Sequence, residues 1–380
     1  MSVIGQQTDE ALDVSAVADI ITSASFVHIL AIADGDGIAA SGILGRTLDT
    51  INIPYQISCV QTNEAAVNRI QAGDDTTTYV TVGMQTKKQD TQIAGDMPLS
   101  IGAYDIAQAI GADIDPLLAI VGSSCCAAMD DDQVRHLQSE ADISQQPGVA
   151  IPTDEIGQGL MYSTRFHAPF SGSEDAVKDL LESCNIDDSP DMEAYRQLAS
   201  RVALEMTTLD APLSAANTIA EWLKPHYIDD GPFLTVEGYA DVLSVLARND
   251  PGLAVGLALD YPVKDRALSV WRENAQRIHT IVANADIRRY QGFSVAKVQA
   301  YPWIATRLLR KFRSKEPVML GYTSQSLVIS CPAATNALSL INTISESMDD
   351  TEIGGSKRLA FLRSSTIDID TSISKLEAKL

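Results

Sequence analysis

The sequence VHILAIADGDGIAASGILGRTL, residues 27 to 48, joins two apolar segments through a pair of Asp-Gly dipeptides. Val27 to Ala33 is a short, continuous apolar run, which is typical of a strand buried on both faces of a parallel sheet. After the dipeptides, apolar residues recur at close to helical spacing. The stretch therefore predicts a strand, a tight turn and a helix, with two carboxylates in the turn.

Those carboxylates, Asp34 and Asp36, admit two interpretations. Open α/β sheets bind ligands at the carboxyl ends of their strands, and two aspartates there can offer oxygens to a divalent cation. The neighbouring glycines let the backbone bend sharply and approach a phosphate closely. Alternatively, the turn is an acidic cap for the helix, with Asp36 as its N-cap, because Asp-Gly pairs are common in turns. The residues alone leave both interpretations open.

The length of the chain, 380 residues, exceeds the size at which one hydrophobic core keeps growing, so we expect two domains. Strand and helix patterns alternate along the first third of the chain and predict a parallel α/β sheet. We expect an α/β domain at residues 1–190, a helical linker at 191–228 and a smaller mixed α/β domain at 229–380. Residues 141–171 are predicted to be rich in loops, and Leu253 to Leu259 are predicted to form a strand.

Nothing in the sequence suggests a membrane or an oxidising compartment. No apolar run reaches the roughly 18 residues that a membrane span needs, and the N-terminus has no basic region followed by an apolar core. The five cysteines are odd in number and lack metal-ligand spacing, so we expect reduced, buried thiols. We therefore expect a cytoplasmic protein with no membrane partner.

Charge is unevenly distributed along the chain. The formal net charge is -22, and 11 of the 28 basic residues are lysine, a composition that suggests a halophilic cytoplasm. Residues 264–315 nevertheless hold 12 Lys or Arg against 3 Asp or Glu, a local balance of +9. This basic segment, with aromatic residues interleaved, suggests a site for a polyanion or an acidic partner. The alternative is that its charges form ion pairs or a solvated helix face.

The turn sequence ADGDGIAASGIL, residues 33–44, resembles the first motif of the DHH phosphoesterase superfamily, most closely its RecJ-like branch in halophilic archaea. Four more stretches follow in the order and spacing of that branch: DPLLAIVGSSCCA at 115–127, GLMYSTRFHAPFSG at 159–172, GPFLTVEGYADVLSVLARNDPG at 231–252 and GGSK at 354–357. The resemblance covers nearly the whole chain. It implies a parallel-sheet DHH domain, a helical linker and a smaller mixed-sheet domain, with nucleic acid in the cleft between the domains.

Active members of this family hold two metal ions, usually manganese, so the resemblance also implies a set of ligands. Asp34 and Asp36 match two of them, and no Asp-His-His triplet occurs. Other residues stand at the remaining ligand positions: Ile32 for the histidine, Thr81 or Val82 for the second aspartate, and Cys125-Cys126 at the end of the fourth motif. Two aspartates cannot build a two-metal centre, although a single Mg²⁺ accepts as few as one or two carboxylates. We therefore predict a degenerate site with no catalytic residues.

This pattern resembles, in its logic, the inactive RecJ relative of the eukaryotic replicative helicase. The hypothesis is a RecJ-like protein of DNA replication or repair that binds single-stranded DNA or RNA and associates with the GINS complex. Glycine amides and a lysine charge in the GGSK motif would then contact phosphate. The predicted nucleic-acid contacts are Arg288, Arg289, Arg307, Arg310, Lys311, Gly354, Gly355, Ser356 and Lys357.

Two other classes of function remain open. The first is a single-strand exonuclease or phosphodiesterase of the RecJ type, dependent on Mn²⁺ or Mg²⁺. Its missing ligands would come from Asp74, Asp75, Asp90, Asp96 and His136. The second is a structural interaction subunit that makes no contact with DNA.

Overall fold

A computed structural model describes most of the chain in two compact units. Unit 1 comprises Met1–Asp142 and Leu246–Ala267, and unit 2 comprises Ile143–Val245 and Leu268–Leu380. The expected domain boundaries near residues 190 and 228 stay a prediction. Within the described ranges, no helix has both the length and the apolar character needed to cross a membrane. The described residues are 12–74, 76–84, 91–95, 97–141, 143–186, 192–208, 213–348 and 350–380.

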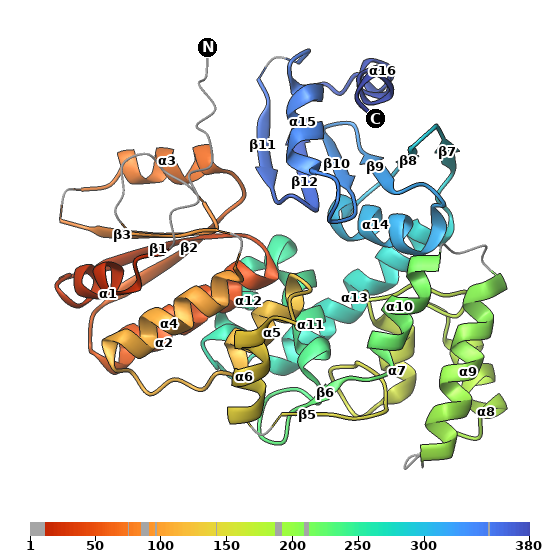
Figure 1. The fold of residues 1–380 in the computed structure, drawn as a ribbon, viewed down its shortest axis with the longest axis horizontal. Helices are drawn as coiled ribbons and strands as arrows, with labels where there is room; N and C mark the ends of the chain where they lie inside the picture. Colours follow the sequence, from red (N-terminus) through yellow and green to blue (C-terminus); the bar gives the residue numbers. More distant parts are fainter. Residues whose placement is uncertain are drawn as a thin grey trace. The chain divides into compact units, whose positions relative to one another are not determined.

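Unit 1 is built on a parallel sheet with the strand order β2-β1-β3-β4 (Figure 1). The central strand is buried along its whole length, as its apolar run predicts, and Ile29 lies beside Ile57 and Val80 in the register. The predicted parallel α/β sheet is therefore confirmed. The strands are β1 (Val27–Ile32), β2 (Tyr55–Val60), β3 (Thr78–Val82) and β4 (Gln92–Ile93).

Helices cover both faces of this sheet: α3 lies on one face, and α2 and α4 lie on the other (Figure 1). The helix that follows the Asp-Gly turn, α2, is buried over most of its length and packs against α4, α5 and α12. The helices of unit 1 are α1 (Val14–Thr22), α2 (Gly35–Thr50), α3 (Asn63–Gln71), α4 (Leu99–Ile110), α5 (Leu117–Cys125), α6 (Asp132–Glu140) and α12 (Pro251–Ala258).

The strand predicted at Leu253 to Leu259 is wrong, because these residues belong mainly to helix α12. Its start carries clear helix signals: the Asp250 side chain accepts a hydrogen bond from the Leu253 N–H, and a proline stands in the first turn. The helix packs so closely on α2 that a Cβ at Gly42 would lie 2.6 Å from the Cβ of Ala258. A helix that is apolar on nearly all sides shows no periodicity, so its apolar run resembles that of a buried strand.

The first part of unit 2 is helical. Residues 141–171, predicted to be rich in loops, contain the short helix α7, which packs against α8. Tertiary contact stabilises this helix: a Cβ at Gly159 would lie 2.0 Å from the Ile151 side chain, and no side chain caps its start. The elements are β5 (Ser144–Gln145), α7 (Ile156–Tyr162), α8 (Glu174–Ser183), α9 (Met192–Thr208), α10 (Leu213–Trp222), β6 (His226–Tyr227), α11 (Val236–Asn249) and α13 (Lys264–Ala283). The end of α11, from Leu246, and the start of α13, up to Ala267, are counted with unit 1.

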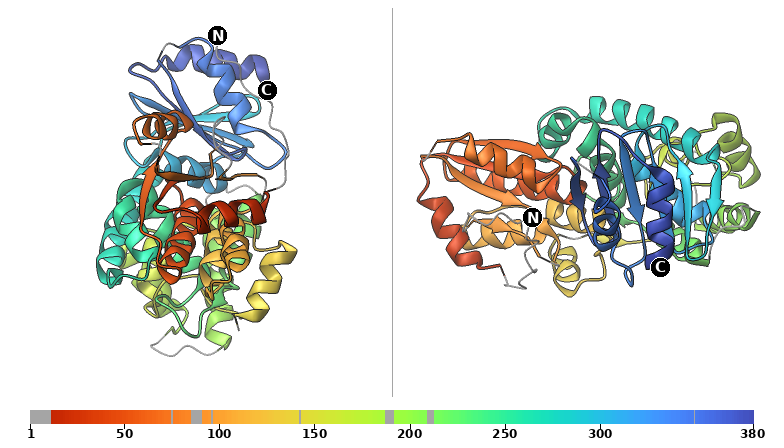
Figure 2. Two further views of the ribbon diagram at one scale, coloured as in Figure 1. Left: turned by 90° about the vertical axis from the view of Figure 1, so that its left-hand side faces the viewer. Right: turned by 90° about the horizontal axis from the view of Figure 1, so that it is seen from above.

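The second part of unit 2 is a six-stranded mixed sheet with the order β11-β12-β10-β9-β8-β7 (Figures 1 and 2). Strands β8 and β9 are parallel and the other pairs are antiparallel. Helices α15 and α16 bury one face in a continuous apolar core, and α14 packs on β9 and β10. The elements are β7 (Ile287–Arg289), β8 (Phe293–Lys297), α14 (Pro302–Leu308), a π-helical turn η1 (Leu309–Arg313), β9 (Val318–Tyr322), β10 (Ser326–Ser330), α15 (Ala337–Ser345), β11 (Glu352–Gly355), β12 (Leu359–Arg363) and α16 (Ile369–Lys379).

Candidate functional site

The first aspartate of the turn, Asp34, is the N-cap of α2. Its backbone is extended, and its Oδ1 accepts a hydrogen bond of 2.9 Å from the Gly37 N–H. The prediction that Asp36 is the N-cap is wrong, because Asp36 already lies in the first helical turn. Burial raises the pKa of Asp34, and the Gly37 N–H and the charge of Arg248 oppose that rise.

Asp36 holds the start of a different helix. Its carboxylate accepts hydrogen bonds from the Leu99 N–H at 2.7 Å and the Ser100 N–H at 3.0 Å, which are the first two amides of α4. Asp36 thus caps α4 although it lies 63 residues earlier in the sequence than Leu99. The residue at the N-cap position of α4 is Pro98, whose side chain makes no capping hydrogen bond. Burial raises the pKa of Asp36 to about 6, and the neighbouring charge of Asp34 contributes to the rise.

The residues at the other predicted ligand positions supply no carboxylate or imidazole. Ile32 is buried and packs on Gly37, where a Cβ would lie 2.7 Å from its Cγ2. Thr81 is buried in β3. At the end of α5, Cys125 is half-buried and Cys126 is exposed, so the expectation that the thiols are buried is wrong for Cys126. Gly122 of α5 lies against Asp36, because a Cβ there would be 2.7 Å from its Oδ1.

These residues do not fit a two-metal centre. Three carboxylate oxygens of Asp34 and Asp36 accept backbone N–H bonds, and a metal ion would have to compete with those bonds. Across the part of the chain that the structure describes, no three His, Cys, Asp or Glu side chains gather in a way that could hold a metal ion.

The alternative ligands are only partly within the described residues. Asp74 accepts hydrogen bonds from the hydroxyls of Thr76 and Thr77. His136 lies 3.3 Å from Glu140 on an exposed face of α6. Asp75, Asp90 and Asp96 lie outside the described residues.

The predicted nucleic-acid contacts fall into three places in unit 2. Arg288 and Arg289 lie on β7, at one edge of the mixed sheet, and Arg289 forms an ion pair of 2.9 Å with Glu316. Residues 354–357 lie at the opposite edge, where β11 turns into β12. The third group, Arg307, Arg310 and Lys311, comes from α14 and the π-helical turn.

The glycine pair at the sheet edge has a structural role in the hairpin. Gly355 has a φ of +112°, and a Cβ there would lie 2.3 Å from the Leu359 carbonyl oxygen. The Ser356 hydroxyl accepts hydrogen bonds from the N–H groups of Arg358 and Leu359 at 3.3 Å. The turn therefore uses Ser356 internally, while Lys357 stays exposed beside it.

The third group belongs to a larger set of basic side chains that influence one another, which we call the cationic cluster: Arg165, Arg307, Arg310, Lys311 and Arg358. Burial is the largest cause of the fall in the pKa of Lys311 to about 7; the charges of Arg307, Arg165 and Arg310 contribute to this fall, and the charge of Glu221 opposes it. Burial also lowers the pKa of Arg310, and Arg358 contributes. Arg165 and Arg358 were not among the predicted contacts, although Arg165 stands in the quoted motif at 159–172.

Hydrogen bonds to the protein frame hold the cationic cluster in place. Arg310 Nε donates to Ser330 Oγ at 2.9 Å, and Arg307 Nη2 donates to the Thr164 carbonyl at 3.2 Å. The buried carboxylate of Asp241 fixes that segment, because it accepts hydrogen bonds from the Thr164 N–H, the Thr164 hydroxyl and the Trp271 indole. Motifs at 159–172 and 231–252 are thus joined through one carboxylate.

The π-helical turn from Leu309 to Arg313 carries two members of the cluster. Its apolar side chains, Leu309 and Phe312, are fully buried, so the turn is anchored while Arg310 and Lys311 stay partly accessible. Such turns are rare and occur frequently at functional sites. The π-helical turn and the basic side chains of the cationic cluster therefore indicate the same part of unit 2 as a candidate functional site.

Comparison with known proteins identifies related sequences over nearly the whole chain. A family model described as "Uncharacterized protein rrnAC1427, C-terminal domain" matches residues 285–376, the region of the mixed sheet. A protein of Haloarcula marismortui described as "Uncharacterized protein rrnAC1427" is 34% identical over 366 residues, which cover 94% of this chain and 95% of that protein.

Comparison with solved structures identifies the fold. RecJ from Thermus thermophilus, in complex with Mn²⁺, has a TM-score of 0.50 at 15% identity; the match covers 98% of this chain and 55% of RecJ. This chain thus spans about half the length of that protein. CDC45 from Entamoeba histolytica has a TM-score of 0.55 at 8% identity, with 96% and 97% of the two chains covered. The predicted RecJ-like fold, with a parallel-sheet domain and a separate mixed-sheet domain, is confirmed.

Proposed function

The chain belongs to the family of the Haloarcula marismortui protein rrnAC1427, and we propose that it is a RecJ-like protein of DNA replication or repair that binds single-stranded nucleic acid without cleaving it. The observation that carries this proposal is the cationic cluster of unit 2. The fold shared with RecJ and CDC45 supports it. The non-catalytic part rests on Asp34 and Asp36, whose oxygens accept the N–H groups of two helix starts.

The cluster is suited to an anion because its positive charges repel one another. Lys311 forms no hydrogen bond or ion pair with any described residue, and burial together with the neighbouring cations makes its charged form unfavourable, so its pKa is low. A phosphate group among these cations offsets that repulsion. Strongly shifted groups of this kind are concentrated at functional sites.

The distribution of charge between the units points to the same place. Unit 1 holds 8 Lys or Arg against 23 Asp or Glu, and unit 2 holds 20 against 27, so their formal net charges are -15 and -7. A polyanion is therefore repelled less by unit 2, where the cationic cluster lies. Neutralised phosphates release counterions, so we expect the affinity to fall steeply with salt concentration.

The protein partner is proposed to be the GINS complex, following the resemblance to the inactive RecJ relative of the replicative helicase. A pull-down with purified GINS proteins from the same organism tests this. Stoichiometric capture supports the proposal, and no capture by folded protein at micromolar concentrations contradicts it. This outcome is independent of the test for nucleic-acid binding.

The pure, folded protein is expected not to hydrolyse 5′-labelled single-stranded DNA or RNA in molar KCl with Mn²⁺. The physical reason is that Asp34 and Asp36 hold helix ends, so their loss should affect stability instead of activity. Asp34→Ala/Asp36→Ala is expected to lower the free energy of unfolding by about 2 kcal/mol or more, since each change removes a helix cap. Cleavage that disappears in the double variant would show that other residues complete a metal site and would favour the exonuclease alternative.

The affinity for single-stranded DNA is expected to rise as the pH falls from 8 to 6. The Lys311 amine, with a pKa of about 7, gains its proton over this range and then attracts phosphate. The gain should be roughly tenfold, the change in the protonated fraction for a one-unit step on each side of the pKa. Fluorescence anisotropy at constant salt measures it. Lys311→Arg is the control, because arginine stays charged and should remove most of the dependence; an equal dependence in both proteins would exclude Lys311 as the titrating group.

A further inference from the structure

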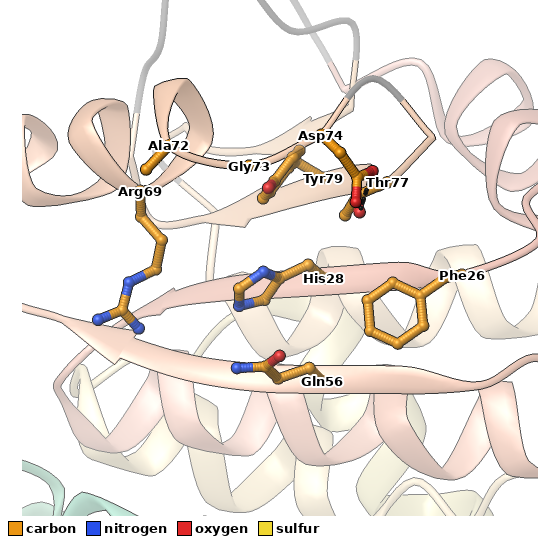
Figure 3. Close-up of a pocket in the computed structure, with 9 residues that line it drawn as sticks. All are labelled: Phe26, His28, Gln56, Arg69, Ala72, Gly73, Asp74, Thr77 and Tyr79. Carbon is orange, nitrogen blue, oxygen red and sulfur yellow. Dashed lines mark hydrogen bonds between the residues drawn. The ribbon is translucent and has the colours of Figure 1, made fainter.

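Unit 1 contains a groove over the sheet face that α3 covers, which we call the α3 groove (Figure 3). Its volume is about 570 Å³, within the range of sites that hold small molecules. It lies toward the amino ends of the strands, since Phe26 directly precedes β1. Asp34 and Asp36 follow the opposite end of that strand, so the groove is separate from the predicted metal site.

Three neighbouring strands form the floor of the groove. His28 on β1 lies beside Gln56 on β2 and Tyr79 on β3 in the parallel register, so the three side chains form a row on one face. The rings of His28 and Tyr79 lie 5.4 Å apart, and His28 Nε2 is 2.9 Å from the Ser58 hydroxyl. The other ring nitrogen of His28, Nδ1, has no hydrogen-bond partner among the described residues.

The groups along the groove differ from one end to the other. Figure 3 shows Arg69 at one end and Phe26 at the other, with His28 and Gln56 between them. Arg69 is exposed and forms no hydrogen bond or ion pair with a described residue. Burial lowers the pKa of His28, and the charge of Arg69 lowers it further, so the arginine acts on the groove floor.

One carboxylate also lines the groove. Asp74 lies away from the Arg69 guanidinium in Figure 3, and Thr76 and Thr77 donate hydrogen bonds to its Oδ1. The Arg69 end is therefore the end that accepts an anion. The half-buried Phe26 offers an apolar ring surface at the far end, and the Gln56 amide offers both a donor and an acceptor.

We propose that the α3 groove binds a nucleoside monophosphate, with its phosphate at Arg69 and its base against Phe26. Such a ligand carries one anionic group and one flat aromatic ring, and the groove presents one cation and one aromatic surface at its two ends. A longer nucleic acid fits less well, because unit 1 carries a net charge of -15 and would repel a polyanion. The proposal does not depend on the cationic cluster of unit 2.

Isothermal titration calorimetry of the full chain with adenosine 5′-monophosphate, adenosine and inorganic phosphate tests this proposal. The wild type should bind the monophosphate, and Arg69→Gln should weaken that binding at least tenfold while leaving the affinity for adenosine unchanged. Phe26→Ala should weaken both the monophosphate and adenosine. Inorganic phosphate alone should bind more weakly than the monophosphate.

The control is Arg135→Gln, which removes an exposed arginine from α6 of the same unit, where it pairs with Asp132. This variant should bind the monophosphate as the wild type does. Lys311→Glu should also leave the calorimetric result unchanged, which separates this site from the one in unit 2. The absence of binding by folded wild type at millimolar ligand, or equal binding by Arg69→Gln, would overturn the proposal.

Discussion

Charge reversal at Arg310 and Lys311 together is expected to weaken binding of a single-stranded oligonucleotide of about 20 nucleotides by roughly 100-fold or more at low salt. Two attractive charges within the cationic cluster become repulsive, and they stand beside Arg307, which the Thr164 carbonyl already holds in place. The dependence of affinity on salt should also become shallower, because fewer phosphates are neutralised. Fluorescence anisotropy over a series of KCl concentrations measures both quantities.

The matched control is Arg288→Glu/Arg289→Glu, which makes the same change in net charge on the β7 edge. There Arg289 is already paired with Glu316, so we expect less than about a fivefold loss of affinity. Lys311→Met is a second variant, in case charge reversal prevents folding. It removes the partly buried charge without adding another, so the protein should be at least as stable as the wild type. If both double variants bind like the wild type, the chain does not use the cationic cluster for nucleic acid, and a purely structural subunit becomes the better hypothesis.

Replacement of Gly238 by alanine is expected to lower the free energy of unfolding of unit 2 by about 3 kcal/mol. Gly238 lies in the first turn of α11, and a Cβ there would lie 2.2 Å from the Ile151 carbonyl carbon and 2.4 Å from the Pro152 nitrogen. Both are backbone atoms, which cannot move aside as a flexible side chain can. The Thr235 hydroxyl holds the same contact by donating to the Ile151 carbonyl at 2.7 Å.

Denaturation followed by tryptophan fluorescence measures this loss in unit 2 alone, because Trp222, Trp271 and Trp303 all belong to that unit. The matched control is Gly157→Ala in the first turn of α7, where the new Cβ would be 3.4 Å from Leu181, an ordinary contact. That variant should be as stable as the wild type or slightly more so, since alanine is the better helix former. Equal stability of the two variants would contradict the close approach of α11 to residues 151 and 152.

Much of the fold could be predicted because its signals are local. The apolar run of β1 and the helix after the Asp-Gly turn occur as expected, and so does the parallel sheet that the alternation of strands and helices predicted. Local signals failed where they were ambiguous or weak. Helix α12 is apolar on nearly all sides, and the short strands β7, β8 and β11 were not predicted. Periodicity needs a longer window and an exposed face to separate helix from strand.

The candidate site required the tertiary structure, because its contacts join residues far apart in the chain. The sequence placed Asp34 and Asp36 in a turn between a strand and a helix. It could not show that Asp36 caps α4, because that contact joins residues 63 positions apart. The basic segment was visible as a local excess of charge, yet the fold separates Arg288 and Arg289 from Lys311 and brings in Arg165 and Arg358. Composition and periodicity act along the chain and determine strands, helices and charge; which side chains meet, and which pKa values shift as a result, follows from packing between distant segments.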